Sequence, residues 1–422
     1  MQEDQSPPAS AGSVAEDAFD AEPEGRIRLQ LSTIAKLNLA DFQNAVPALR
    51  ELAVVNDTDA PICELTVSLR AEPPFIKPRT WSLDSVGAGE TYHVTQLDVE
   101  LDGALLSRLT EAEPATLLFE LRGGRQPDEV LADHQRTVEL LARNQWGGIG
   151  HLPEMVAAFV QPNDPAIDRL LKAAAIALQS SGMSGSIDGY THGAKRAWEL
   201  ASAIWAAVLQ RKLNYALPPA SFEHTGQKIR SPGQVLDAVL ATCLDLALVF
   251  AACLEQAHLN PLLVFTQGHA FVGLWLRDEE FSNAVIDDIT AVRKRLKLQE
   301  LLVFETTLAA QGQPVRFSQA ITNANRQLSE EQEDKFELVV DVKRARMSRI
   351  KPLALAQPIA DLAPSPDQPE PIVTVEDAPD LPDEVITETP TAELDPKDRL
   401  ARWQRKLLDL SLRNALLNFK AG

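Results

Sequence analysis

The chain has 422 residues, of which 45% are apolar and 24% are charged, enough for two or three globular domains. Its formal net charge of −20 argues against direct binding to a phosphate backbone, which requires clustered Lys and Arg. The cysteines Cys63, Cys243 and Cys253 are too few for a disulfide framework and have no metal-ligand spacing. This cysteine usage favours a reducing compartment.

Residues 1–25 are acidic and rich in Pro and Ala, and they lack the basic and apolar regions of a signal peptide. We expect this leader to be disordered. No apolar run reaches the roughly 20 residues of a membrane span. The longest, residues 244–254, is interrupted by Asp245. We therefore expect a cytoplasmic protein with no membrane partner.

Short alternating runs separated by turn residues extend over residues 26–145. They cover residues 52–55, 64–69, 92–101 and 116–121, and the third is the clearest alternation in the chain. Strands of this length and spacing predict an antiparallel, immunoglobulin-like β-sandwich. Cys63 is interpreted as a small core residue of this domain. The region shows no catalytic constellation, so we interpret it as an interaction or spacer module.

The pattern becomes helical at residue 146. Apolar residues recur at intervals of three and four over residues 165–178 and 194–213. Trp198 and Trp205 fall on this spacing among Ala and Leu and are expected in the core. Residues 214–232 contain proline breaks and no period, which predicts an ordered loop.

A cysteine opens the apolar helix that follows this loop. Thr242 and Asp245 have the spacing of a capping box, which places Cys243 at the first helical position. Unpaired backbone N–H groups and the helix dipole favour a thiolate there. Cys253 lies about three turns further on among apolar residues. Cys243 is therefore the predicted nucleophile, and Cys253 is predicted to be an inert core residue.

A histidine follows at the start of a strand. His269 comes after the apolar run 262–265 and a turn with a glycine, and it opens the run 270–276. A histidine at a strand edge can face a cleft and take the thiol proton. A solvated turn histidine is the alternative interpretation. The pairing with a cysteine at a helix start favours the catalytic one.

The third candidate is an acid that orients the histidine ring. Glu305 ends the strand-like run 301–304 and is the favoured residue. Asp287 and Asp288 are the alternatives, although Asp at this place is typical of a cap for the helix expected over residues 289–298. The sequence leaves the acid open among these three residues.

A Pro- and acid-rich run without aromatic residues covers residues 350–395 and predicts a disordered linker. Residues 396–422 then predict an amphipathic helix with a basic polar face, beginning at Pro396. A Leu-rich helix at this place suggests the start of a further domain that lies beyond this sequence.

From about residue 214 to residue 307 the chain resembles the transglutaminase-like superfamily of papain-related cysteine enzymes. The resemblance rests on Ala241-Thr242-Cys243 at the helix start, His269-Ala270-Phe271 at a strand start, and Glu305-Thr306-Thr307 after a strand. The family pattern has Gly where Ala241 stands and Asp-Pro-Thr at the acid, and residues 278–300 lengthen the connection. The resemblance implies an α+β domain over residues 146–349 with a Cys-His-acid triad.

Two further motifs resemble the front end of large bacterial proteins that carry a superfamily 1 helicase downstream. These motifs are FEHTGQKIR at residues 222–230 and WQRKLLDLSLRNALLNF at residues 403–419. Many such proteins are thought to act in defence against foreign DNA. This sequence contains no P-loop motif, so ATP, Mg²⁺ and nucleic acid are implied only for a downstream helicase.

The sequence thus predicts an α+β multidomain chain whose second domain acts as a cysteine protease or another amide hydrolase or acyl transferase. Protein or peptide would be the substrate, and no cofactor is expected within this sequence. The alternative is a vestigial transglutaminase-like fold that binds a protein or peptide as a sensor for the helicase. A purely structural scaffold is a third hypothesis.

Overall fold

A computed structural model describes residues 26–123, 126–312, 314–354 and 375–381. The chain divides into two compact units. Unit 1 comprises residues 1–160, 218–230 and 350–363, and unit 2 comprises residues 161–217, 231–349 and 364–422. The expected leader, the expected helix over residues 396–422 and most of the expected linker lie outside the described residues. The first division falls after residue 160, whereas the sequence places it after residue 145.

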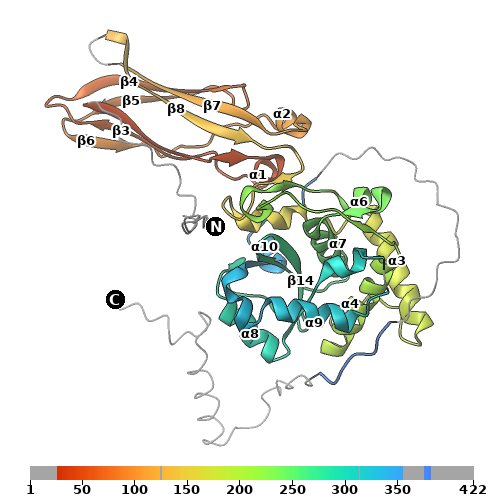
Figure 1. Ribbon diagram of the computed structural model, residues 1–422. Coiled ribbons are helices and arrows are strands. Elements are labelled where there is room, and N and C mark those ends of the chain that lie inside the picture. The colour runs from red at the N-terminus through yellow and green to blue at the C-terminus, as the bar shows by residue number, and fades with distance from the viewer. Residues whose placement is uncertain (1–25, 124–125, 313, 355–374, 382–422) are drawn as a thin grey trace, which may run out of the picture. The chain divides into compact units, whose positions relative to one another are not determined.

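Unit 1 is built on two mostly antiparallel sheets, drawn in red to yellow in Figure 1. The first sheet has the order β1 (Ile27–Thr33), β3 (Leu49–Asn56) and β6 (Glu90–His93). The second has the order β2 (Lys36–Leu37), β8 (Gln126–Leu140), β7 (Glu113–Gly123), β4 (Ile62–Glu72) and β5 (Arg79–Val86). Two short helices, α1 (Leu39–Gln43) and α2 (Gly103–Arg108), lie between strands.

Side-chain alternation explains the second sheet. In β4 every second residue from Leu65 to Ala71 is buried, and in β7 every second residue from Ala115 to Leu121 is buried. Such alternation gives each strand one apolar face for the core. The runs expected at 52–55, 64–69 and 116–121 lie within β3, β4 and β7.

The expected strand over residues 92–101 is wrong for most of its length. β6 ends at His93, and beyond it only Leu101 forms an isolated bridge, with Ile76. Leu97 and Val99 are nevertheless half-buried between exposed neighbours. The alternation of apolar and polar residues therefore identified a segment with one covered face. A strand also needs a hydrogen-bonding partner, and the alternation does not show whether one is present.

Residues 218–230 belong to unit 1 because they pair with the segment before η1 (Pro153–Phe159). After α5 (Phe222–Thr225), β11 (Gln227–Lys228) runs antiparallel to β9 (Gln145–Trp146). Gly226, which lies between α5 and β11, has a φ of +86°. A Cβ at this position would lie 2.0 Å from the Trp146 carbonyl oxygen. Only glycine fits this approach. Part of the segment predicted as an ordered loop thus forms a small strand pair.

The core of unit 2 is a five-stranded sheet in which all neighbours are antiparallel. Its order is β15 (Val285–Ile286), β17 (Phe336–Asp341), β13 (Pro261–Thr266), β14 (His269–Trp275) and β16 (Leu301–Phe304). β13 is buried at every position, since side chains on both of its faces are covered. β14 and β16 lie side by side at one end of the sheet, where the candidate residues gather.

Helices enclose this sheet (Figure 1). They are α3 (Pro165–Ser180), α4 (Gly193–Leu209), α6 (Pro232–Ala238), α7 (Cys243–Gln256), α8 (Ile289–Lys297), α9 (Phe317–Gln327) and α10 (Val342–Met347), with the short turns η2 (Thr306–Ala310) and η3 (Glu330–Lys335). A strand pair, β10 (Asn214–Tyr215) with β12 (Leu240–Ala241), precedes α7. The helices expected over residues 165–178, 194–213 and 289–298 are confirmed within a few residues.

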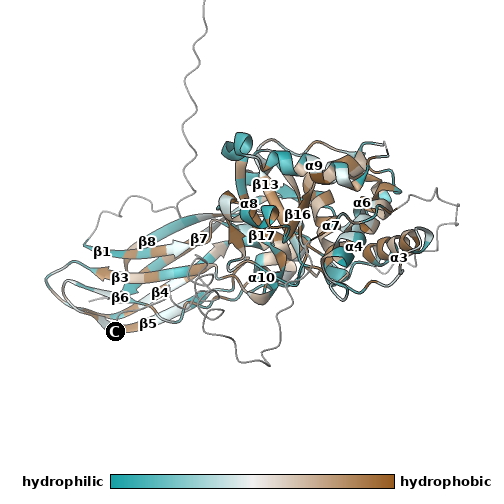
Figure 2. Ribbon diagram, turned by 90° about the horizontal axis from the view of Figure 1, so that it is seen from below, coloured by the Kyte–Doolittle hydropathy of each residue, from teal (hydrophilic) through white to brown (hydrophobic). Residues whose placement is uncertain are grey.

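An aromatic cluster fixes α7 against the sheet and α4. The Trp205 ring stacks on Phe250 of α7 at 5.7 Å, and Phe250 meets Phe304 of β16 edge-to-face at 5.3 Å. Trp198 and Trp205 are buried, as expected from their spacing. In Figure 2 the brown of hydrophobic residues is concentrated on α7 and the neighbouring strands. This packing holds the start of α7 and the end of β16 in a fixed relation.

Candidate active site

The site begins with a cysteine at a capped helix start. Thr242 is the N-cap of α7, and its hydroxyl accepts from the Asp245 backbone N–H at 3.2 Å. Asp245 returns the bond by accepting from the Thr242 N–H at 3.0 Å. The expected capping box is thus confirmed, and Cys243 is the first residue of α7. Its backbone N–H belongs to the first turn, where such groups have no partner within the helix.

A tight hairpin positions the histidine. β13 and β14 pair with Thr266 opposite His269, which leaves the two-residue turn Gln267-Gly268. Gly268, at the second central position of the turn, has a φ of +67°, a conformation that glycine adopts at little steric cost. His269 is therefore the first residue of β14, and 21% of its side chain is exposed.

Glu305 meets the histidine from the neighbouring strand. β16 pairs antiparallel with β14 and ends at Phe304, opposite Val272. The next residue, Glu305, places its Oε2 2.8 Å from His269 Nε2. Since this contact uses Nε2, Nδ1 is the ring nitrogen left for Cys243, with which the His269 ring also forms a hydrogen bond. The three residues favoured by the sequence thus form one connected chain.

The remaining lone pairs of the Glu305 carboxylate are occupied. Its Oε1 accepts from the Thr307 N–H at 3.0 Å and from the Thr307 hydroxyl at 2.8 Å. Its Oε2 also accepts from the amide of Gln327, the last residue of α9. A carboxylate held by several donors is fixed in orientation and favoured in its charged form. The side chain of Glu305 is 7% exposed.

The charge states follow from these contacts. Burial works to raise the pKa of Glu305, but the bonds and charge of His269 and the Thr307 donors hold it below its ordinary value. Burial works to lower the pKa of His269, but its bonds to Cys243 and Glu305 and their negative charges raise it to about 10. At neutral pH the ring of His269 is therefore an imidazolium beside the Glu305 carboxylate.

Tyr215 is a fourth polar neighbour that the sequence did not single out. β10 runs parallel to β12 with Tyr215 opposite Ala241, two residues before Cys243. The Tyr215 hydroxyl forms a hydrogen bond with Cys243. Burial first, and then the negative charge of Cys243, raise the pKa of this phenol. The hydroxyl therefore remains protonated and able to donate a hydrogen bond.

Neither Tyr215 nor Gln327 has a sequence signal that distinguishes it. Tyr215 lies in a two-residue strand between irregular segments, and Gln327 is an ordinary polar residue at a helix end. Their proximity to the site arises from the packing of β10 against β12 and of α9 against β16. Only the three-dimensional arrangement identifies these two residues, because neither belongs to a sequence motif.

The alternative acids lie elsewhere. Asp288 caps α8, because its Oδ1 accepts from the Thr290 N–H at 2.8 Å. Asp287 follows β15 and is exposed. In the strand order, β17 and β13 separate β15 from β14, so these aspartates follow the strand at the opposite edge from Glu305. The structure therefore brings Glu305, and neither aspartate, to His269.

Cys253 lies ten residues into α7, about 15 Å along the helix from Cys243. It is fully buried, and burial raises the pKa of its thiol above the ordinary range. Its expected role as a core residue is confirmed. Cys63, by contrast, is exposed on β4, so its interpretation as a core residue is wrong. The alternation of β4 is interrupted at Glu64, which has a φ of +56°, so that Ile62 and Leu65 are both buried and Cys63 is turned outward.

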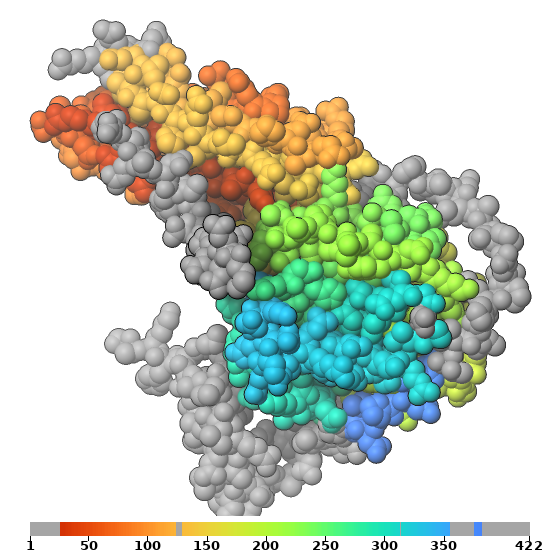
Figure 3. All heavy atoms as spheres, viewed as in Figure 1, coloured from red at the N-terminus to blue at the C-terminus, as the bar shows by residue number. Residues whose placement is uncertain are grey.

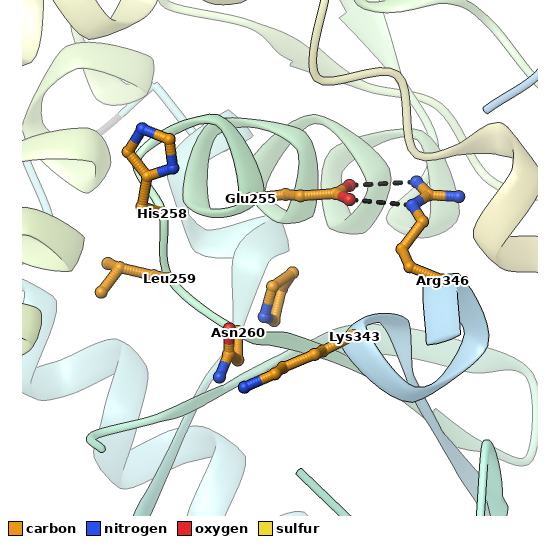
Figure 4. Close-up of a pocket in the computed structure, with 7 residues that line it drawn as sticks. Glu255, His258, Leu259, Asn260, Lys343 and Arg346 are labelled. Carbon is orange, nitrogen blue, oxygen red and sulfur yellow. Dashed lines mark hydrogen bonds and ion pairs between the residues drawn. The ribbon is translucent and has the colours of Figure 1, made fainter. Parts of the chain in front are cut away.

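A cavity of about 320 Å³ lies at the other end of α7 (Figure 4). Glu255 and Arg346 form a double ion pair across it at 2.8 and 3.0 Å. Lys343 on its rim pairs with Asp278 at 2.6 Å and Glu280 at 3.3 Å. Its cations are thus paired with carboxylates, and it contains none of the candidate catalytic residues.

Within the described residues, no group of three or more His, Cys, Asp or Glu is arranged to ligate a metal. No helix in that part of the chain combines the length and apolarity needed to cross a bilayer. No protein-family model matches the chain, and a search of curated proteins finds no similar sequence.

Proposed function

We propose that unit 2 is a transglutaminase-like cysteine enzyme that cleaves or transfers amides of a protein or peptide substrate. The observation that carries the proposal is that Glu305 Oε2 lies 2.8 Å from His269 Nε2 while Cys243 lies beside the same ring. A thiol at a helix start, a histidine beside it and a fixed carboxylate on the second ring nitrogen are the parts of a nucleophilic triad.

In the proposed reaction, the Cys243 thiolate attacks the substrate carbonyl carbon and the carbonyl π electrons move to oxygen. The Cys243 N–H at the helix start is available to the resulting oxyanion. The imidazolium of His269 gives its proton to the leaving amine as the C–N bond breaks. An acyl thioester on Cys243 remains, and His269 is neutral.

The second half uses His269 as a base. Water or an amine attacks the thioester carbonyl, and His269 accepts the proton of this nucleophile. The C–S bond then breaks and restores the thiolate–imidazolium pair. Attack by water gives hydrolysis, and attack by an amine gives acyl transfer. Glu305 keeps the ring oriented and stabilises its charged form throughout.

The alternative proposal is a protein- or peptide-binding module with a vestigial triad. One observation favours it: the Cys243 side chain is 0% exposed, and the Tyr215 hydroxyl occupies a hydrogen-bonding position on it. A substrate carbonyl would have to displace this tyrosine or reach the sulfur beside it. The binding module would need no such access.

The biological setting remains a proposal from the motif resemblances. The motif at residues 222–230 lies within unit 1, and the motif at residues 403–419 lies outside the described residues. The same resemblance supports a bacterial defence protein with a downstream helicase, and the low cysteine count supports a cytoplasmic location. For unit 1, the strand pattern supports an immunoglobulin-like sandwich that serves as an interaction or spacer module. Nucleic acid would be a partner of that helicase only.

Acylation by p-nitrophenyl acetate tests the proposed chemistry without knowledge of the substrate. We expect a burst of about one equivalent of p-nitrophenolate per chain, with the acetyl group on Cys243. Cys243→Ala should remove the burst, and His269→Gln should slow it. Added amine should shorten the lifetime of the thioester if the enzyme is a transferase. Acetylation of Cys243 no faster than that of the exposed Cys63 would favour the binding module.

A further inference from the structure

A short segment within the expected linker lies against unit 2. The Val375 N–H donates to the Ser181 hydroxyl at 3.0 Å, and the Glu376 N–H donates to the Ser202 hydroxyl at 3.3 Å. The Val375 side chain is buried, at 7% exposure. The expectation of a disordered linker is therefore wrong for residues 375–381. Figure 3 shows this segment, in deep blue, against the surface of unit 2.

The surface that receives it is made by two helices. Ser181 is the C-cap of α3, and Ser202 lies within α4 between Ala201 and Ala203. Small residues at this part of α4 allow a peptide backbone to come close to the helix. Ser202 is itself buried, at 2% exposure, so its hydroxyl needs hydrogen-bond partners, and the peptide supplies one.

The segment has a three-residue pattern that matches this surface. Val375 is buried and Ala378 and Leu381 are half-buried, whereas Asp377, Pro379 and Asp380 are exposed; Glu376, beside Val375, is also half-buried. A spacing of three is the repeat of a polyproline II strand, which makes no internal backbone bonds and offers its N–H groups to a partner. Three apolar side chains at this spacing are thus covered, and the two aspartates are exposed.

We propose that the surface of α3 and α4 around Ser181 and Ser202 is a peptide-docking site whose occupant is segment 375–381 of the same chain. Its serine hydroxyls accept the peptide N–H groups, and its apolar surface selects apolar residues three apart. The proposal does not depend on the activity of Cys243.

The docking limits where the following part of the chain can be. Pro396 comes fifteen positions after Leu381. Whatever the conformation between them, they are at most about 50 Å apart, because each residue spans no more than about 3.6 Å.

Disulfide crosslinking in the full chain tests the docking. In a Cys63→Ser background, Ser181→Cys with Val375→Cys should oxidise at least about tenfold faster than Ser181→Cys with Val385→Cys, because docking raises the local concentration of the thiol. Both linker positions are valines, so the pairs are matched. Mass spectrometry of the linked peptides measures the rates. Equal rates would overturn the proposal.

Proteolysis provides a second measurement. Leu381→Asp should raise the rate of cleavage after Glu376 by a glutamyl endopeptidase about tenfold, because a docked bond must open before it is cut. Asp380→Asn, at an exposed neighbour, should leave the rate unchanged. Residue 381 lies five positions beyond Glu376, so the sequence next to the cleaved bond is the same in each protein. An unchanged rate in Leu381→Asp would contradict the docking.

Discussion

The two ends of α7 place the same residue type in opposite chemical settings. Cys243 and Cys253 are both fully buried on one helix. Around Cys243 are the His269 ring and the Tyr215 hydroxyl, whereas burial alone acts on Cys253 and raises the pKa of its thiol. The comparison teaches that two equally buried cysteines on one helix can have different polar neighbours. On the proposed function, these neighbours and the position in the helix, rather than burial, make Cys243 the reactive one.

The largest expected effect separates the two cysteines directly. In a Cys63→Ser background, Cys243→Ser should reduce alkylation by iodoacetamide at pH 7 by about tenfold or more, because an ordinary thiol is only a few per cent thiolate there. Cys253→Ser should leave the rate unchanged. It should instead lower the free energy of unfolding by about 1–3 kcal/mol, since it buries an unpaired hydroxyl. Mass-resolved alkylation and urea unfolding measure both effects, and rapid alkylation of Cys253 would break the comparison.

The second prediction tests which group raises the pKa of His269, the histidine beside Cys243. A raised pKa means that His269 keeps its proton until the pH reaches about 10. Glu305→Gln removes the neighbouring negative charge, so the pKa of His269 should fall toward its ordinary value of 6.5. An NMR titration of the ring gives the value.

Asp287→Asn is the matched control for this titration, because Asp287 follows the strand at the opposite edge of the sheet. It should leave the pKa of His269 unchanged. A shift caused by Asp287→Asn and not by Glu305→Gln would show that the assignment of the acid is wrong.

The smallest expected effect concerns the amide that holds Glu305. Gln327→Ala should slow the acylation burst about fivefold, which corresponds to the ~1 kcal/mol of a typical hydrogen bond. Asn325→Ala, at an exposed position of the same helix, should not change it. Stopped-flow measurement of p-nitrophenolate gives both rates. Equal rates in the two variants would mean that Gln327 has no part in positioning the carboxylate.

Local sequence determined where α7 begins and which residue is its first. Thr242 and Asp245 cap the helix through contacts three residues apart, so their spacing alone placed Cys243 at the first position. The helices α3 and α4 follow likewise from the period of their apolar residues, and the strands β13, β14 and β16 follow from short apolar runs. Periodicity failed at residues 94–101, and composition failed at residues 375–381. In both places an extended segment depends on what lies beside it.

Tertiary structure alone decided the rest of the site. Asp287, Asp288 and Glu305 all follow short apolar runs, and only the strand order, with β16 beside β14 and β15 at the far edge, separates them. Tyr215 and Gln327 reach the site from elements 28 residues before Cys243 and 22 residues after Glu305. Cap and strand patterns arise from neighbours within a few residues. The order of strands depends on the packing of the whole unit, which no local pattern encodes.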